Sequence, residues 1–209
     1  MTSTPIAQGA AATSLRDRGI SGTWASIAVA SWIVAVDNWS FWKTFLAAQE
    51  SSPLFVGIAA LSLGVVLVGF FGTVLRALCI QRLGTGVLAG VLIASAAVAH
   101  YVDSWGVLFD KAMIRNIVET DFREASELLS WPALMDLAVR GLLPASVLWY
   151  IGVRRSAVVQ TVFQTAGFAI GTVALTGVIA FLFYGTFAAT FRNHRELRFQ
   201  LVPSNYVNA

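Results

Sequence analysis

Residues 54–75 read LFVGIAALSLGVVLVGFFGTVL, and this stretch decides the fold class of the chain. It contains no charged side chain and consists mainly of glycine, alanine, aliphatic residues and phenylalanine. A helix needs about 20 mostly apolar residues to cross the hydrocarbon core of a bilayer. The stretch is therefore predicted to form a transmembrane helix.

The composition of the whole chain agrees with this prediction. Hydrophobic residues make up 57% of the 209 residues and charged residues only 12%, and the mean hydropathy is +0.72, which excludes an ordinary soluble protein. A net charge of +3 in such a protein reports membrane topology rather than nucleic-acid binding, so we expect no nucleic-acid partner. The single cysteine, Cys79, cannot form an intramolecular disulfide. No metal-ligand motif is evident, so no metal site is expected.

Five apolar segments are long enough to be read as membrane spans. They are Ile20–Val36, Leu54–Leu75, Leu83–Tyr101, Pro132–Ile151 and Val158–Phe187. The fold prediction is an all-α, polytopic membrane protein with five transmembrane helices and amphipathic interfacial helices on its outer face. Residues 1–19 are predicted to be a cytoplasmic tail, residues 20–187 the transmembrane domain, and residues 188–209 an interfacial segment that begins a linker.

Arginine placement orients these spans. The link between the second and third spans carries Arg76 and Arg82, and the link between the fourth and fifth carries Arg154 and Arg155, with no acidic residue in either. Basic residues concentrate in cytoplasmic loops, so the N-terminus is predicted to be cytoplasmic and the C-terminus to lie on the outer side of the membrane. Aromatic residues that favour the headgroup level then lie near the outer ends (Trp39, Trp42, Tyr101, Trp105, Trp131) and the inner ends (Trp24, Trp149, Tyr150).

The longest connection runs from about residue 102 to residue 131. Within it, residues 113–129 read MIRNIVETDFREASELL and hold four of the chain's eleven acidic residues. Apolar residues gather on one side of a helical wheel and charged residues on the other, which is typical of a helix lying on a membrane surface. Asp121 and Glu124 have the spacing of a capping box, so we predict two short helices at about 106–130 with a bend near Thr120.

Two stretches resemble a known family. Residues 109–130, FDKAMIRNIVETDFREASELLS, resemble the periplasmic link of bacterial phosphoethanolamine–lipid A transferases, the type linked to polymyxin resistance. Residues 191–209, FRNHRELRFQLVPSNYVNA, resemble that family's passage from the last transmembrane helix into its catalytic domain. The motif that carries the resemblance is Asp110-x-x-Met113-Ile114-x-Asn116-x-x-Glu119-Thr120-x-x-x-Glu124-Ala125, joined by Pro203-Ser204-Asn205-Tyr206.

The resemblance implies a place and a chemistry. The place is the bacterial inner membrane, and the chemistry moves phosphoethanolamine from phosphatidylethanolamine to lipid A through a covalent intermediate on a threonine. In the family, a soluble periplasmic domain holds zinc and this nucleophile. We expect that domain to be absent from these 209 residues. The chain is then the anchoring and lipid-binding partner of its catalytic domain, has no catalytic residue of its own, and is inactive alone.

The resemblance also implies a substrate-binding site at Asn116, Thr120 and Glu124. Steps of four residues place such side chains near one stripe of a continuous helix. Glu124 can pair with the ethanolamine ammonium, while Asn116 and Thr120 can hydrogen-bond phosphate oxygens or the bound nucleophile. Trp105 stands at about the place where family members often have a tyrosine, and it can stack but cannot supply a phenol hydroxyl.

Other interpretations stay open at the level of sequence. A related transferase with a different glycan acceptor shares the same membrane design. A small transporter or channel can use Asp136 and Arg140, which lie four residues apart within the fourth predicted span. For these two residues a structural ion pair is the favoured interpretation. Gly86-x-x-x-Gly90 predicts close helix packing inside the domain.

Overall fold

The structure is a computed structural model that describes residues 19–49, 51–79, 83–105, 130–154, 156–194 and 197. Across these ranges the regular elements are helices, and Ile20 and Val153 form an isolated bridge. The elements in chain order are α2 (Gly22–Trp32), η1 (Ile33–Asp37), α3 (Trp39–Ala47), α4 (Pro53–Leu78), α5 (Gly84–Trp105), α8 (Trp131–Asp136), η2 (Leu137–Leu142), α9 (Leu143–Ile151) and α10 (Val158–Asn193). The segments η1 and η2 are π-helical. The all-α prediction is confirmed.

Four helical stretches are long and apolar enough to cross a membrane: α4, α5, the continuous run α8–η2–α9, and α10. The segment predicted as the first span instead forms a shorter apolar helix, Gly22–Asp37, made of α2 and η1. It stops because Asn38 leaves the helical region of backbone conformation, with φ −104° and ψ 35°, and α3 begins at the next residue. At the other end of the chain, α10 continues past the predicted limit of Phe187 to Asn193.

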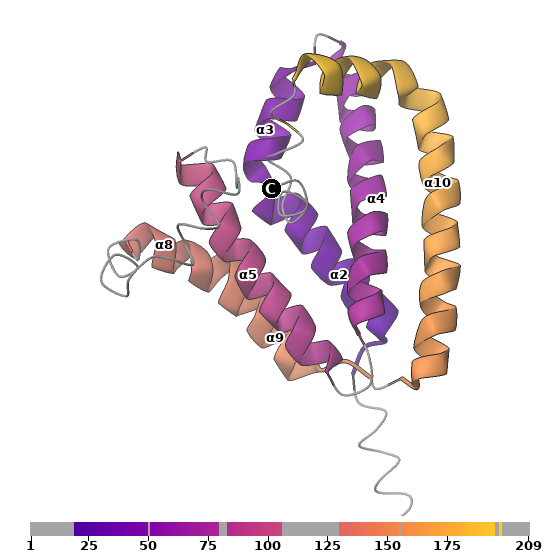
Figure 1. Cartoon of the computed structure of the whole chain (residues 1–209). Coiled ribbons are helices and arrows are strands. Elements are labelled where there is room, and N and C mark those ends of the chain that lie inside the picture. Colours follow the sequence, from indigo (N-terminus) through magenta and orange to yellow (C-terminus); the bar gives the residue numbers. More distant parts are fainter. Residues whose placement is uncertain are drawn as a thin grey trace, which may run out of the picture.

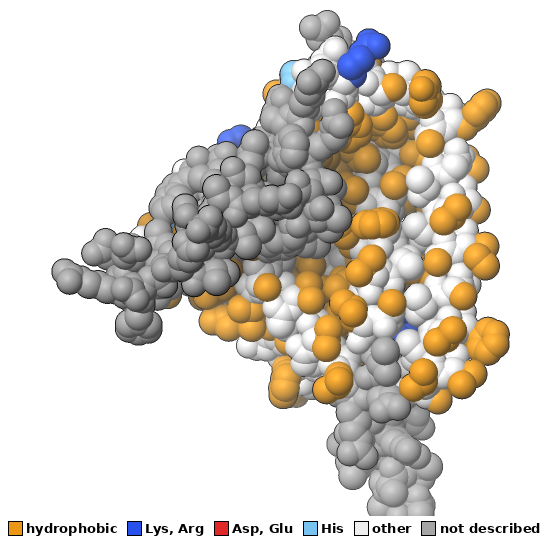
Figure 2. Space-filling model, in the orientation of Figure 1, with side chains coloured by type: hydrophobic (Ala, Val, Ile, Leu, Met, Phe, Trp, Pro, Cys, Tyr) orange, Lys and Arg blue, Asp and Glu red, His pale blue; other side chains and the backbone are white. Residues whose placement is uncertain are grey.

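The helices pack in two groups joined by α2 (Figure 1). In one group α10 and α2 both lie against α4, and in the other α5 packs along η2 and α9. A shared core closes the junction with side chains such as Ala30, Phe71, Leu88 and Leu148, which come from α2, α4, α5 and α9. Elsewhere hydrophobic side chains remain exposed over α4 and α10 (Figure 2), as expected where lipid rather than water is the solvent.

A second small core lies at the end of the molecule where α3 meets α4. Phe41 and Phe45 of α3 pack there with Leu63 of α4 and with Leu197. The last turns of α10 bend over this end (Figure 1), and Gln49 Nε2 donates a hydrogen bond of 2.8 Å to Thr190 Oγ1. The end of α10 is therefore attached to the turn that follows α3.

Glycines permit the closest helix contacts. A Cβ atom at Gly69 of α4 would lie 2.8 Å from Thr172 Cγ2 of α10, and one at Gly141 of η2 would lie 3.1 Å from the Ala96 Cβ of α5. Such close approach is the usual role of small residues between membrane helices. Gly86 and Gly90 have open space around them within the described part of the molecule, so the prediction that this pair packs internally is wrong.

Arg76 joins three helices at the opposite end. It lies in the last turn of α4, where the helix dipole favours a cation, and its side chain is fully buried. Its guanidinium donates to Gln164 Oε1 of α10 at 2.6 Å, to Thr23 Oγ1 of α2 at 3.3 Å and to the Cys79 carbonyl at 3.3 Å. The residue that the sequence placed in a link is thus a buried junction of α2, α4 and α10.

Candidate functional site

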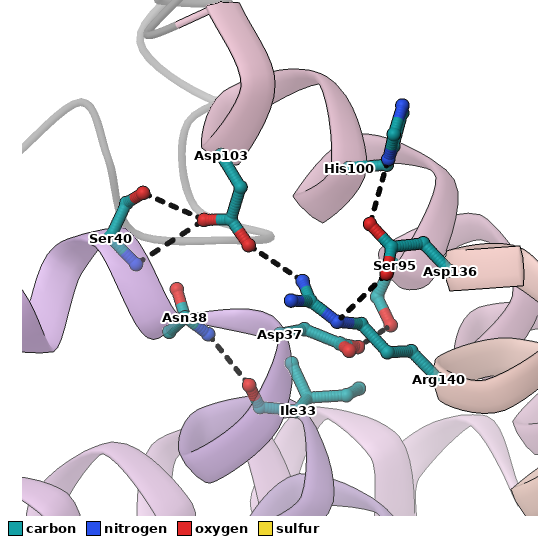
Figure 3. Close-up of polar contacts among 9 residues, drawn as sticks. All are labelled: Ile33, Asp37, Asn38, Ser40, Ser95, His100, Asp103, Asp136 and Arg140. Atoms are coloured by element: carbon teal, nitrogen blue, oxygen red, sulfur yellow. Dashed lines mark hydrogen bonds and ion pairs between the residues drawn. The ribbon is translucent and has the colours of Figure 1, made fainter. Parts of the chain in front are cut away.

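A group of polar side chains, here named the polar cluster, lies where α5 approaches η1, α3, α8 and η2 (Figure 3). Its members are Asp37, Asn38, Ser40, Ser95, His100, Asp103, Asp136 and Arg140. Ionisable residues within membrane spans are costly and are usually functional or paired. The polar cluster is therefore the candidate functional site of the described residues.

Arg140 lies at the centre of the polar cluster and joins two carboxylates. Its Nη1 atom is 2.6 Å from Asp103 Oδ2, and its Nε atom is 3.8 Å from Asp136 Oδ1. Asp136 Oδ2 in turn lies 2.8 Å from His100 Nδ1. The predicted pairing of Asp136 with Arg140 is confirmed.

Asp103 extends the cluster to α3. Its Oδ1 atom accepts hydrogen bonds from the Ser40 hydroxyl at 2.7 Å and from the Ser40 backbone N–H at 3.3 Å. Because its other oxygen holds Arg140, this one carboxylate connects α3, α5 and η2. A charge-assisted bond of this kind is stronger than a neutral one, so Asp103 fixes the relative position of three elements.

Asp37 is the most deeply buried carboxylate of the cluster, with 2% of its surface exposed. Its Oδ2 atom accepts a hydrogen bond from the Ser95 hydroxyl of α5. Its Oδ1 atom has no hydrogen-bond partner within the described ranges. Asp103 and Asp136 both pair with Arg140, whereas Asp37 lies close by with only the Ser95 hydroxyl as a hydrogen-bond partner within the described ranges.

The two π-helical segments explain how these side chains come together. Asp37 belongs to η1 and Arg140 to η2, and π-helical turns often occur at functional sites. A π-helical turn disturbs the regular i→i−4 bonding, and side chains satisfy the affected carbonyls. Asn38 Nδ2 donates to the Ile33 carbonyl at 2.8 Å, Trp42 Nε1 to that of Val34 at 2.6 Å, and Trp32 Nε1 to that of Arg140 at 2.9 Å.

The predicted substrate-binding residues Asn116, Thr120 and Glu124 lie outside the described residues. Trp105 is the last residue of α5, and its side chain also lies outside the description. The polar cluster joins the two helices that flank these residues, since residues 106–129 connect the end of α5 to the start of α8. His100 and Asp103 on one side are bound to Asp136 and Arg140 on the other, so the cluster holds both ends of that stretch in place.

Sequence reasoning did not single out Asp37, Ser40, Ser95 or Asp103 as members of a site. The available signal was an acidic residue directly after a long apolar run, in AVDNWS for Asp37 and in AHYVDSW for Asp103. Such residues also occur at solvated helix ends, so the pattern alone does not identify partners. Ser95 gives no signal, because single serines are common in membrane helices.

Within the described ranges, no group of three or more His, Cys, Asp or Glu side chains is arranged to hold a metal ion. The chemistry that the polar cluster offers is therefore that of fixed charge and hydrogen bonding. It can orient helices and adjacent segments.

Comparison with known proteins identifies the family. Residues 67–209 match the family model described as phosphoethanolamine transferase EptA/EptB. The chain belongs to this family. It is 29% identical over 174 residues to phosphoethanolamine transferase EptA of Escherichia coli K12, an alignment that covers 82% of this chain and 32% of that protein. It is 26% identical over 117 residues to phosphatidylethanolamine transferase Mcr-1 of Escherichia coli, which covers 56% of this chain and 22% of Mcr-1.

The fold agrees with the sequence match. The integral membrane protein lipooligosaccharide phosphoethanolamine transferase A (EptA) of Neisseria meningitidis superposes with a TM-score of 0.78 at 20% identity. The superposition covers 91% of this chain and 35% of that protein. The chain thus spans about a third of the length of its EptA relatives and is a multi-pass membrane domain of the EptA/Mcr type, as the resemblance predicted.

Proposed function

We propose that this chain anchors and supplies the lipid-binding part of an enzyme that transfers phosphoethanolamine from phosphatidylethanolamine to lipid A. The observation that carries the proposal is the family match over residues 67–209, which includes the whole of the 106–130 connection. The lipid bilayer is then both the solvent of this domain and the source of its donor. The working partner is a periplasmic catalytic domain of the same enzyme.

The proposed topology has five crossings of the bacterial inner membrane, with the N-terminus cytoplasmic, the C-terminus periplasmic and interfacial helices at about 106–130. The short first segment is compatible with a crossing because α2, η1 and α3 run antiparallel to α4 along most of its length. A Cβ atom at Gly22 would lie 3.3 Å from the Arg76 guanidinium near one end. One at Gly64 would lie 3.6 Å from the Trp42 ring towards the other.

The polar cluster supports a positioning role for this domain. By joining α5 to α8 and η2, it fixes the relative position of the two helices that residues 106–129 connect. On this proposal Glu124 pairs with the ethanolamine ammonium, Asn116 and Thr120 hydrogen-bond the phosphate, and Trp105 stacks beside the headgroup. Holding a donor in a fixed geometry lowers the entropic cost of the reaction without any bond being made by this domain.

The family resemblance places zinc and the nucleophilic threonine in the catalytic domain. Zinc there would supply the charge that stabilises the transferred phosphoryl group. The described residues of this chain offer no fitting set of zinc ligands, so no step of the transfer is assigned to zinc here. What this domain contributes is the position of the lipid.

The test uses the full-length transferase that carries this domain. Glu124→Ala and Asn116→Ala should each lower phosphoethanolamine transfer about tenfold or more, as loss of a charge-assisted or positioning contact does. Mass spectrometry of lipid A reads the product, and Glu127→Ala is the matched control because Glu127 lies outside the proposed set. Wild-type modification in both variants at equal protein levels would contradict the proposed site.

The same experiment separates the alternatives. If phosphoethanolamine appears on core-oligosaccharide sugars rather than on lipid A phosphates, the acceptor is a different glycan and the donor site is unchanged. A transporter that uses Asp136 and Arg140 finds little support, because both side chains are occupied with each other and with His100 and Asp103.

A further inference from the structure

An apolar groove opens on the membrane-facing side of the molecule, between α4 and the run α2–η1–α3. Its volume is about 620 Å³, which is within the range of roughly 300–1,000 Å³ typical of sites for small ligands. The lining includes Val34, Ala35, Trp39, Trp42, Gly64 and Val65. The groove is separate from the polar cluster, whose members Asp37 and Asn38 are buried in the bundle on η1 and at the turn that follows it.

The walls of the groove suit hydrocarbon. Ser31 supplies the one hydroxyl among the lining residues, and the Trp42 indole N–H is already bonded to the Val34 carbonyl. A polar ligand would find almost nothing to bond with, whereas an acyl chain loses no hydrogen bond on entry. Because Gly64 has no side chain, the groove stays deep at this residue. A Cβ atom there would contact only the Trp42 ring, at 3.6 Å.

One end of the groove carries residues suited to a phospholipid headgroup. Trp39 is 56% exposed at the start of α3, and Lys43 is exposed one helical turn later. Residues four apart share a helix face, so Lys43, which does not itself line the groove, lies on the same face of α3 as Trp39. Tryptophan favours the headgroup level, and lysine attracts lipid phosphate. Lys43 forms no ion pair within the described residues.

We propose that this groove is a phospholipid-binding site, distinct from the headgroup site at residues 116–124. One acyl chain lies along the groove over Gly64, the glycerol region lies beside Trp39, and the phosphate pairs with Lys43. In the proposed topology the lipid belongs to the outer leaflet, where α4 begins. The inference requires a membrane domain but does not depend on phosphoethanolamine transfer.

The test uses the chain in lipid nanodiscs with a phosphatidylethanolamine probe that carries a photoactivatable diazirine near the end of one acyl chain. Peptide mapping should place cross-links at lining residues of α2 and α4. Gly64→Leu fills the groove and should lower this cross-linking about fivefold or more, because the leucine takes the place of buried methylene groups. Gly57→Leu is the matched control, since Gly57 also lies on α4 but has open space around it and no part in the groove.

Lys43→Gln tests the phosphate contact without changing the packing, because the side chain is exposed. Cross-linking should fall about threefold to fivefold, and Arg192→Gln, an exposed basic residue on α10, should leave it unchanged. A diacylglycerol probe with the same acyl chains but no phosphate should label the groove weakly and should not respond to Lys43→Gln. The proposal fails if cross-links fall outside the groove, if Gly64→Leu and Gly57→Leu behave alike while both remain folded, or if the diacylglycerol labels as strongly as the phospholipid.

Discussion

Arg140 is the residue on which the polar cluster depends, and its removal gives a direct prediction. Arg140→Gln leaves Asp103 and Asp136 without their cation in a largely buried place. Loss of one partner of a fully buried ion pair costs about 3–5 kcal/mol. Because these side chains are partly exposed, the free energy of unfolding should fall by less, about 2–3 kcal/mol. Thermal unfolding in detergent, followed by tryptophan fluorescence, measures the change.

A double variant shows whether Arg140→Gln lowers the free energy of unfolding through the lost ion pair or through lost packing. Asp103→Asn in the Arg140→Gln background removes the uncompensated carboxylate, so the double variant should be less destabilised than the sum of the two single variants. Strict additivity of the three measurements would contradict the ion-pair account. Arg192→Gln controls for loss of a positive charge at an exposed position.

Arg76 presents the opposite case, a fully buried cation whose partners in the described structure are neutral. Gln164→Glu would place a carboxylate where the Gln164 amide oxygen now accepts a hydrogen bond of 2.6 Å. Because a carboxylate would add a full negative charge beside the buried guanidinium, it should attract Arg76 more strongly than the amide oxygen does, and this variant should raise the melting temperature. Gln164→Leu, which keeps the bulk but removes the acceptor, should lower it. A Gln164→Glu variant that melts below the wild type would show that desolvation of the new carboxylate exceeds the gain.

At the scale of helices, the contact between α4 and α10 depends on the absence of a side chain at Gly69. Gly69→Ala would bring a Cβ atom to 2.8 Å from Thr172 Cγ2 and should destabilise the fold by about 1–3 kcal/mol. Gly57→Ala on the same helix meets open space and should be neutral or slightly stabilising. Thr172→Ala should rescue Gly69→Ala in a thermal-unfolding assay. Equal effects of Gly69→Ala and Gly57→Ala would contradict the proposed contact.

The sequence predicted which helices exist better than how they meet. Length and hydropathy identified α4, α5, the run from Trp131 to Ile151, and α10, because a bilayer sets the length of an apolar helix independently of its neighbours. The contact glycines were assigned to Gly86 and Gly90, whereas the close approaches occur at Gly69 and Gly141. Glycine spacing cannot choose between these positions, since the neighbour that makes a glycine necessary lies on a distant segment.

The π-helical segments η1 and η2 mark a second limit of sequence reasoning. The sequence of an apolar stretch does not show that its backbone hydrogen bonds change from the α-helical to the π-helical pattern at residues 33–37 or 137–142. Trp42, whose indole N–H bonds one of the affected carbonyls, was predicted only as a ring at the headgroup level. The pairing of Asp136 with Arg140 was predictable because the two residues are four apart on one helix. The ion pair between Arg140 and Asp103 joins residues 37 apart in sequence, so only the folded structure reveals it.

At the scale of the whole molecule, the family and the membrane setting followed from sequence, while the substrate site stays a prediction. The motif around Asn116 pointed to the family that the match over residues 67–209 confirms. The structure adds what no motif contained, which is a buried charge network at both ends of the segment that carries Asn116, Thr120 and Glu124. These contacts fix the relative position of α5 and α8, the two helices that this segment connects.

The proposed topology can be tested by labelling introduced cysteines, because the native Cys79 should not react under the same conditions. Cys79 is buried, and burial raises the pKa of its thiol, so little of the reactive thiolate is present at the pH of labelling. The native chain should therefore resist maleimide until it is unfolded. Cysteines introduced at exposed positions then report their own side of the membrane.

Ser51→Cys in the turn between α3 and α4, and Ser130→Cys before α8, should react with a membrane-impermeant maleimide in spheroplasts. Ala157→Cys, before α10, should react only after the inner membrane is opened, because Arg154 and Arg155 place that turn in the cytoplasm. Labelling of Ala157→Cys in intact spheroplasts, with Ser130→Cys protected, would place residues 106–129 in the cytoplasm and remove them from any periplasmic lipid headgroup.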